Sequence, residues 1–451
     1  MSGPCISIRA VLAEQTERTR GSSTMRIKQL IHDSDSRVTS LEAQITALES
    51  QIAVLSELRD CERATGVALR FLVAPVRTLP VELLAEIFIL AIRQPSHIQD
   101  AYRVSHVCCD WRHIAHGTPR LWAGPIKVDF QPFGSVETYA DGLQTWFARS
   151  SPLSLSISFT GLRAGMWFVH INPRITEEVL RISLRWRSLR MLQRAPGSLV
   201  KQLAEGRLDS LEELELQKVA PDDPDFDPTT ILSFTTAPRL RKLTIQSDCQ
   251  IPMPWVQITD ITLTRGGSRD AALDIFAQCA NLVRAFISTN GWFMRPVRPD
   301  IITLNHLRHL SLTFFGMEEH GMSFFDSLSA PALDELCLDF EADPTIQWAE
   351  RTFTAFQLRS PNITKLEING YSLNLPSSAF RTALLHAPIL THLSLNDCSD
   401  CIDDNLLRGL CYTDGVTPLV PRLHTLTLIE MSEIGVVRRC SGKYDCVSVV
   451  D

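Results

Sequence analysis

The sequence predicts an α/β protein in which a long N-terminal helix and a short helical module precede a solenoid of repeated strand–helix coils. Three patterns carry this prediction. Apolar residues recur with a seven-residue period near the N-terminus, apolar residues at helical spacing fill residues 79–122, and one short apolar motif recurs through residues 211–428. A chain of 451 residues also exceeds the size of one ordinary compact core. We therefore expect several structural units in order along the chain.

The first predicted element is a coiled-coil helix over residues 25–60, which follows a polar, flexible tail at 1–24. The heptad has Ser34 as its single polar core residue. Its a positions hold Ile31, Val38, Ile45 and Ile52, and its other d positions hold Ile27, Leu41, Leu48 and Leu55. β-branched residues at a with Leu at d favour a parallel two-stranded coil, so we expect a homodimer. The alternative is a single amphipathic helix that lies on its own chain.

A helical module is predicted at residues 79–122, after a linker at 61–78. Pro80 suits a first helical turn because it has no backbone N–H to leave unpaired there. A second helical stretch is expected to start near Asp100 and to end at Gly117 and Pro119. About 45 residues give little core of their own, so the module should lean on a partner or on a neighbouring domain.

The module resembles an F-box. The resemblance rests on Leu79-Pro80, Glu82-Leu83-Leu84, Ile87-Phe88, Val107-Cys108 with Trp111-Arg112, and Pro119-Arg120-Leu121-Trp122. It implies docking to a Skp-type adaptor, which bridges to cullin and RING subunits. The adaptor-binding residues it implies are Leu79, Pro80, Leu83, Leu84, Ile87, Phe88, Val107, Cys108, Trp111, Leu121 and Trp122. Cys109-Asp110 departs from the family pattern, which more often has basic or polar residues ahead of the Trp, and this puts a contact at the rim of the interface in doubt.

After a predicted linker at 123–150, residues 151–430 are predicted to form the solenoid. Copies of one apolar motif stand about 26 residues apart, and in each copy the last two apolar residues alternate with a polar one, as in a half-buried strand. The copies are Leu211-Leu214-Leu216, Leu240-Leu243-Ile245, Ile258-Ile261-Leu263, a weaker Leu282 with Ile287, Leu307-Leu310-Leu312, Leu333-Leu336-Leu338, Ile363-Leu366-Ile368, Leu390-Leu393-Leu395 and Leu423-Leu426-Leu428. Residues 151–159 and 185–192 are expected to supply the first strands, and 431–451 a C-terminal tail.

These copies resemble leucine-rich repeats, and the copy with Cys398 resembles the cysteine-containing class often found behind F-boxes. The resemblance implies a right-handed horseshoe solenoid. Residues beside or between the apolar positions should face away from the core, so we expect target contacts there. These candidates are Arg241, Lys242, Thr244, Arg308, His309, Ser311, Lys365, Glu367, His392 and Ser394.

The two resemblances together imply the substrate-recognition subunit of a Skp–cullin–F-box ubiquitin ligase with no catalysis of its own. One alternative is an interaction scaffold outside any ligase, and another is a small-molecule receptor that uses the concave side of the solenoid. We expect no cofactor, because the sequence has no Gly-rich phosphate loop, nucleophile elbow or convincing carboxylate pair. We also expect no metal, since neither Cys108-Cys109 with His113 and His116 nor Cys398 with Cys401 makes a convincing site.

Composition excludes other classes. A net charge of −7 argues against nucleic-acid binding through a broad basic face. No apolar run approaches the roughly 18 residues of a membrane span, and the N-terminus lacks the apolar core of a secretory signal. We therefore expect a cytoplasmic or nuclear protein whose scattered cysteines are mostly free thiols.

Overall fold

The computed structural model describes residues 20–92, 97–161, 172–217, 219–220, 227–246, 250–264, 269–289, 300–315, 321–341, 346–371, 373–398, 401–410, 417–429 and 447–450. The chain divides into two compact units, Met1–Leu84 and Ala85–Asp451. Within the described ranges, no helix is long and apolar enough to span a membrane.

The first unit is dominated by helix α2, Arg20–Leu72, followed by the short 3-10 helix η2, Pro75–Thr78. The predicted helix at 25–60 lies inside α2, and residues 1–19 of the predicted tail lie outside the described residues. The structure corrects the expected linker at 61–78, because the helix continues through Leu72. Gly66 does not break it, since a single glycine inside a helix costs only about 1 kcal/mol relative to alanine.

The heptad side chains of α2 are exposed in this single chain. Among the a and d residues, the exposed fraction is 49% for Val38, 54% for Ile31 and 64% for Leu55. No described residue of the first unit covers this apolar stripe. Dimerisation through α2 stays a prediction.

Four short helical segments make up the module that follows. They are α3 (Val81–Ala91), α4 (His97–Ser105), α5 (Cys109–His116) and η3 (Pro119–Leu121), and the division between the two units falls within α3. The expectation of one helix from about Asp100 to Gly117 is wrong. Cys108 has an extended backbone and caps α5, its sulfur accepting a hydrogen bond from the Trp111 N–H at 3.5 Å.

The expected linker at 123–150 instead holds the first coil of the solenoid. Strand β1, Ile126–Asp129, buries Ile126 and Val128, and helix α6, Val136–Arg149, follows it. Ser135 caps α6, and the helix buries Leu143, Trp146 and Phe147 on one face. The strand is too short to stand out from the sequence, so the sheet starts earlier than the repeats predict.

In the described part of the second unit, thirteen parallel strands form one sheet. The strands are hydrogen-bonded in the order β1-β2-β3-β5-β7-β8-β9-β11-β13-β15-β17-β18-β19. Their bounds are β2 (Leu155–Thr160), β3 (Trp186–Met191), β5 (Glu213–Leu216), β7 (Lys242–Gln246), β8 (Asp260–Thr264), β9 (Arg284–Thr289), β11 (His309–Phe314), β13 (Glu335–Phe340), β15 (Lys365–Asn369), β17 (His392–Asn396), β18 (Thr425–Ile429) and β19 (Val447–Val450). The strand β19 lies inside the expected C-terminal tail, so that expectation is wrong for these four residues.

All nine copies of the apolar motif place their last two apolar positions in this sheet. The pairing aligns them in one row across the strands: Leu214, Leu243, Ile261, Ala285, Leu310, Leu336, Leu366, Leu393 and Leu426. Ala285 fills the middle position of the weak copy and is fully buried. Side chains of this row pack on equivalents from the neighbouring strands, which is why the spacing in the sequence predicts them well.

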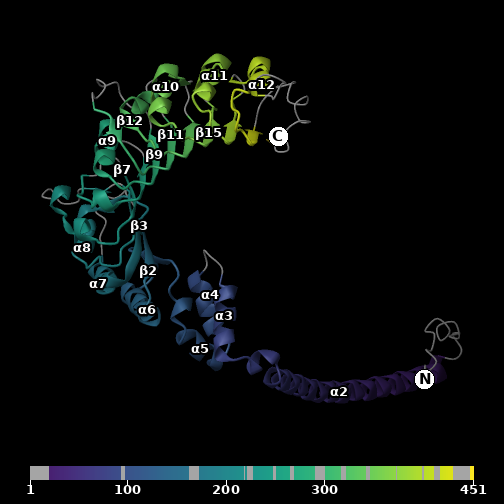
Figure 1. The fold of residues 1–451 in the computed structure, drawn as a ribbon. Coiled ribbons are helices and arrows are strands. Elements are labelled where there is room, and N and C mark those ends of the chain that lie inside the picture. The colour runs from purple at the N-terminus through teal and green to yellow at the C-terminus, as the bar shows by residue number, and fades with distance from the viewer. Residues whose placement is uncertain are drawn as a thin grey trace. The chain divides into compact units, whose positions relative to one another are not determined.

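Helices cover the sheet on the side of the buried residues. They are α7 (Pro173–Arg181), α8 (Gly197–Ala204), α9 (Arg269–Gln278), α10 (Glu350–Arg359), α11 (Ser377–Leu385) and α12 (Asp404–Leu410). Helices α10, α11 and α12 follow one another along one side of the strands (Figure 1). Three two-stranded pairs, β4-β6, β10-β12 and β14-β16, accompany the main sheet.

One backbone pattern recurs at eight successive junctions between coils. The carbonyl of the residue before one strand accepts two hydrogen bonds from consecutive N–H groups of the next coil. Glu212 O, for example, accepts from Arg241 N and Lys242 N, both at 3.0 Å. The same pair of bonds recurs at the carbonyls of Arg241, Thr259, Val283, Arg308, Asp334, Thr364 and Thr391. This repeated geometry fixes the register between coils, and the region resembles an α/β solenoid.

Candidate functional site

Helix α3 presents apolar side chains to solvent. Leu83, Ile87 and Leu90 are 52%, 45% and 82% exposed, and their spacing places them on one face of the helix. Phe88 is 1% exposed and faces the interior, where its ring lies 4.7 Å from that of Trp111. Leu90 is not among the residues that the F-box resemblance implies. Its seven-residue spacing from Leu83, two helical turns, would have predicted that it shares this face.

The eleven residues implied by the F-box resemblance fall into three groups. Pro80, Leu83, Ile87 and Val107 are exposed, and Leu79, Cys108 and Trp111 are half-buried. Leu84, Phe88, Leu121 and Trp122 are buried. The structure therefore corrects the expectation that this last group could contact a partner directly, because these side chains belong to the chain's own core.

Trp122 shows why the closing residues of the motif are internal. Its indole Nε1 donates to the Ala115 carbonyl at 2.7 Å, and the Trp146 indole of α6 donates to the Trp122 carbonyl at 2.7 Å. The two indole rings meet edge to face at 5.1 Å, and the Arg149 guanidinium lies 4.7 Å from the centre of the Trp122 ring. Trp122 thus joins the helical module to the first coil of the sheet.

A groove opens beside the exposed Val107. Gln99, Tyr102, Arg103, His106 and Val107 line it, and its volume is about 520 Å³. Val107 itself is 56% exposed. An apolar wall next to polar rims suits a protein partner, because interfaces bury apolar anchors within a polar surround.

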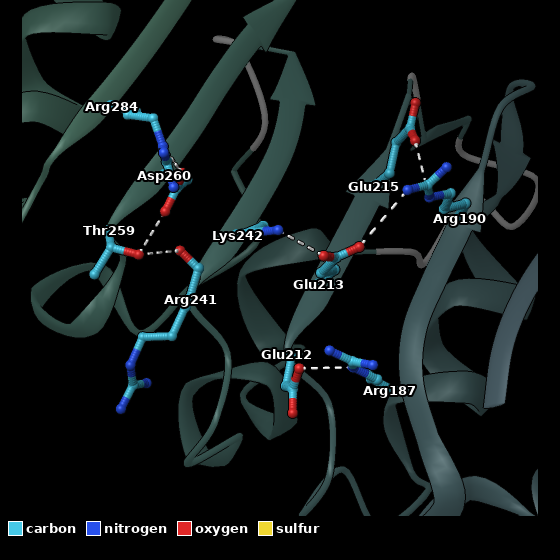
Figure 2. Close-up of polar contacts among 10 residues, drawn as sticks. All are labelled: Arg187, Arg190, Glu212, Glu213, Glu215, Arg241, Lys242, Thr259, Asp260 and Arg284. Atoms are coloured by element: carbon cyan, nitrogen blue, oxygen red, sulfur yellow. Dashed lines mark hydrogen bonds and ion pairs between the residues drawn. The ribbon is translucent and has the colours of Figure 1, made fainter. Parts of the chain in front are cut away.

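The second candidate surface is the exposed face of the sheet, where the predicted target-binding residues lie. All ten are exposed or half-exposed. Figure 2 shows the Glu213 carboxylate between two cations of neighbouring strands. Lys242 Nζ lies 2.9 Å from Glu213 Oε1, and Arg190 Nη2 lies 3.6 Å from Glu213 Oε2. The hydrogen bond from Lys242 is the main reason that the pKa of Glu213 is lowered.

Further along the sheet, Glu335 repeats this arrangement. It accepts a hydrogen bond from Lys365 Nζ, and its Oε2 lies 3.0 Å from His309 Nδ1. The Lys365 bond is the largest cause of the lowered pKa of Glu335, followed by the bond from His309. Three of the predicted target-binding residues, Lys242, His309 and Lys365, are therefore already engaged within the chain.

Arg241 and Arg308 are different. Arg241 Nη1 donates to the carbonyls of Pro238 and Leu240, and neither arginine has an ion pair among the described residues. Figure 2 shows the Arg241 guanidinium pointing away from the other residues drawn. Both residues are exposed.

The cysteine-containing coil is tightly packed. Cys398 Sγ donates to the Ile368 carbonyl at 3.6 Å and to the Asn396 carbonyl at 3.2 Å, and a Cβ at Gly370 would come within 2.4 Å of that sulfur. Cys401 is also buried, and its thiol donates to the Cys398 carbonyl at 3.0 Å. In the part of the chain that the structure describes, no group of three or more His, Cys, Asp or Glu side chains could hold a metal ion.

Comparison with known proteins assigns the helical module. The F-box-like family model matches residues 76–126, so the chain contains an F-box-like domain. Among solved structures, the chain is similar to the Rad7–Elc1 complex of yeast, with 12% identity, coverage of 86% of this chain and 97% of that chain, and a TM-score of 0.40. It is also similar to the TLR13–ssRNA13 complex, with 14% identity, coverage of 56% and 44%, and a TM-score of 0.27. No curated protein matches the chain.

Proposed function

We propose that this chain is the substrate-recognition subunit of a Skp–cullin–F-box ubiquitin ligase. Its F-box-like domain would dock a Skp-type adaptor, and through it a cullin and a RING subunit. The exposed face of the sheet would hold the target protein. The chain itself would supply no catalytic group and no cofactor, and it would act in the cytoplasm or nucleus.

The observation that carries the proposal is the exposed apolar surface of the F-box-like domain. Ile87, Leu90 and Val107 are all at least 45% exposed, and Leu83 lies on the same face of α3 as Ile87. A monomeric soluble protein keeps large contiguous apolar patches off its surface unless a partner covers them. In protein interfaces, large apolar anchors of this kind carry most of the binding free energy.

The repeated coils support a receptor role. We propose that they are leucine-rich repeats, since they recur about every 26 residues with one row of aliphatic side chains that is buried from Leu214 to Leu393, and since Cys398 is buried against the preceding coil. Stacked coils place many side chains on one continuous surface. Holding a target near an associated conjugating enzyme would raise its effective concentration and fix its orientation, which is sufficient for catalysis by proximity.

The experiment is capture of adaptor and cullin from a lysate of the protein's own source. The test variant carries Ile87→Asp and Val107→Asp, which place carboxylates on the exposed surface and leave the buried Phe88 and Trp122 intact. We expect wild type to capture both partners and the variant to lose them while its thermal melting is unchanged. The matched control carries Leu358→Asp and Leu385→Asp, two exposed leucines of α10 and α11 that should leave capture intact.

Retention of the adaptor by the Ile87→Asp, Val107→Asp variant would mean that the adaptor binds a surface other than the exposed apolar surface of the F-box-like domain. Failure of the wild-type chain to capture any Skp-type adaptor would end the ligase proposal and favour an interaction scaffold. The melting measurement separates loss of the surface from loss of the fold.

A further inference from the structure

The exposed face of the sheet is divided by charge. We define the basic half as the exposed residues of β7, β8, β9 and β11 with the residue before each strand. Its charged members are Arg241, Lys242, Asp260, Arg284 and Arg308. The acidic half comprises β13 and β15 with the residue before each strand and Glu341 just after β13. Its charged members are Asp334, Glu335, Asp339, Glu341, Lys365 and Glu367.

In the basic half, ion pairing leaves an excess of positive charge. Lys242 is paired with Glu213 on the neighbouring strand, and Arg284 Nε lies 2.5 Å from Asp260 Oδ1. Arg241 and Arg308 have no carboxylate partner among the described residues. They stand at equivalent positions immediately before β7 and β11, because both carbonyls accept the same double hydrogen bond from the next coil.

In the acidic half, the excess has the opposite sign. Its one cation, Lys365, binds Glu335. Asp339, Glu341 and Glu367 have no cation partner within the described ranges, and Asp339 Oδ1 is buried without a hydrogen-bond partner. The exposed rings of Phe315 (44%) and Tyr371 (72%) follow β11 and β15, on either side of Glu341 in the strand order.

We propose that this face, in the target-receptor role proposed above, binds a target segment whose own charges are segregated, with carboxylates against Arg241 and Arg308 and cations against Glu341 and Glu367. Within the two halves, these four are the exposed charged residues that have no oppositely charged partner among the described residues. The aromatic rings beside Glu341 add a surface on which a lysine or arginine side chain can lie.

Length and charge both restrict the occupant. Six strands, β7, β8, β9, β11, β13 and β15, lie about 4.8 Å apart, so the two halves together span about 24 Å. An extended segment of about seven residues covers that distance across the strands. Because Arg241 precedes its strand and Glu341 follows its strand, a segment that reaches both must run obliquely and needs about nine residues. A uniformly acidic or uniformly basic segment would be attracted by one half and repelled by the other, whereas a segregated segment is attracted by both.

The experiment compares two fluorescein-labelled peptides of the same composition on the full chain. One has the segregated sequence Asp-Ser-Asp-Ser-Lys-Ser-Lys-Ser, and the other has the alternating sequence Asp-Ser-Lys-Ser-Asp-Ser-Lys-Ser. Fluorescence anisotropy at low salt should show the segregated peptide binding about tenfold more tightly, since several weak ion pairs act together. The preference should disappear in about 1 M salt, where charges more than about 3 Å apart are screened.

Variants locate the site. Arg308→Glu and Glu367→Lys should each remove most of the preference for the segregated peptide, because each brings a like charge against one end of it. Arg351→Glu and Glu350→Lys make the same changes at exposed residues of α10 and should leave the preference unchanged. Equal binding of the two peptides to wild type, or a preference that survives both sheet variants, overturns the inference. Adaptor capture by the same samples reports separately on the proposed ligase role.

Discussion

Helix α2 and the stacked coils both carry regularly spaced aliphatic residues, yet only the coils bury them. Leu243, Leu310 and Leu366 are at most 3% exposed, whereas Leu41 and Leu48 of α2 are both 56% exposed. Each coil meets a neighbour with the same spacing, so its leucines pack on equivalent leucines. Among the described residues of the first unit, α2 has no such neighbour. Regular spacing therefore identifies an element, and the availability of a matching neighbour decides whether its apolar face is covered.

In the F-box-like domain, a single helix carries both a covered and an uncovered apolar side chain. Phe88 of α3 is 1% exposed, and the adjacent Ile87 is 45% exposed. The F-box motif in the sequence contains both residues but does not tell which of them is buried and which is exposed. Changes at residues of each kind can test the comparison between covered and uncovered apolar faces.

The largest expected effect is in the covered region. Leu393→Asp places a carboxylate in a row where Leu366 and Leu426 are its register partners. Burying an uncompensated charge and losing the leucine should cost about 4 kcal/mol or more of the free energy of unfolding. Circular dichroism melting should show a strongly lowered Tm or a chain that does not fold.

The matched control for this change is Ser394→Asp. Ser394 is the next residue of β17 and is half-exposed, so a carboxylate there stays solvated and the Tm should move little. Equal melting of the two variants would mean that the leucine row is not the core of the coils.

The second effect concerns the junction between the F-box-like domain and the sheet. Trp122→Ala removes a fully buried indole that bonds Ala115 and packs on Trp146. We expect a loss of about 3–5 kcal/mol in the free energy of unfolding. Adaptor capture at a temperature where the variant stays folded should persist. A variant that keeps the wild-type Tm but loses the adaptor would instead make Trp122 a direct contact.

The sequence predicts the sheet well because each strand follows the same short alternation of buried and exposed residues, and this alternation recurs in every coil. Even the weak copy at Leu282 and Ile287 forms a strand, β9, since the alternation of buried and exposed residues survives with Ala285 in the row. The boundaries are harder to predict. Strand β1 and helix α6 were missed because one short strand and a capped helix do not repeat anything nearby.

The candidate surfaces are only partly predictable for a different reason. The motif at 79–122 and the alternation of the strands name the right segments. Whether Trp122 is internal depends on Trp146, and whether Lys242 is free depends on Glu213, 29 residues earlier. These pairs of residues lie far apart in the sequence and follow no repeating spacing. They can therefore be identified only from the folded structure.

A third, smaller effect tests the uncovered helix. If the exposed stripe of α2 is covered by a second copy, Ile45→Lys with Leu48→Lys should weaken self-association of the full chain at least about tenfold. Analytical ultracentrifugation across a concentration series measures this. The control, Ala43→Lys with Ser50→Lys, adds the same charge at two f positions on the outer face of the heptad. A monomeric mass for the wild-type chain at every concentration would contradict the dimer.

The smallest expected effect lies inside the acidic half of the sheet face. Burial first, and then the neighbouring Glu341, raise the pKa of Asp339 from 3.8 to about 6. The folded chain thus binds a proton at this site more tightly than the unfolded chain does. Ionised Asp339 therefore lowers stability, fully above about pH 6 and not at all below about pH 3.8.

Asp339→Asn should remove this cost without changing the shape of the side chain. Because Asp339 is partly exposed, solvent screening reduces the gain to about 1 kcal/mol at pH 7.5. About half of it should remain at pH 5, where the folded wild type is already mostly protonated. Melting of variant and wild type at the two pH values measures the gap, with Glu350→Gln on α10 as a control that should show none. A gap of the same size at both pH values would show that ionisation of Asp339 is not its cause. A gap that shrinks on acidification would show that the stacked coils, which cover their leucines so completely, leave part of their charge uncompensated on the opposite face.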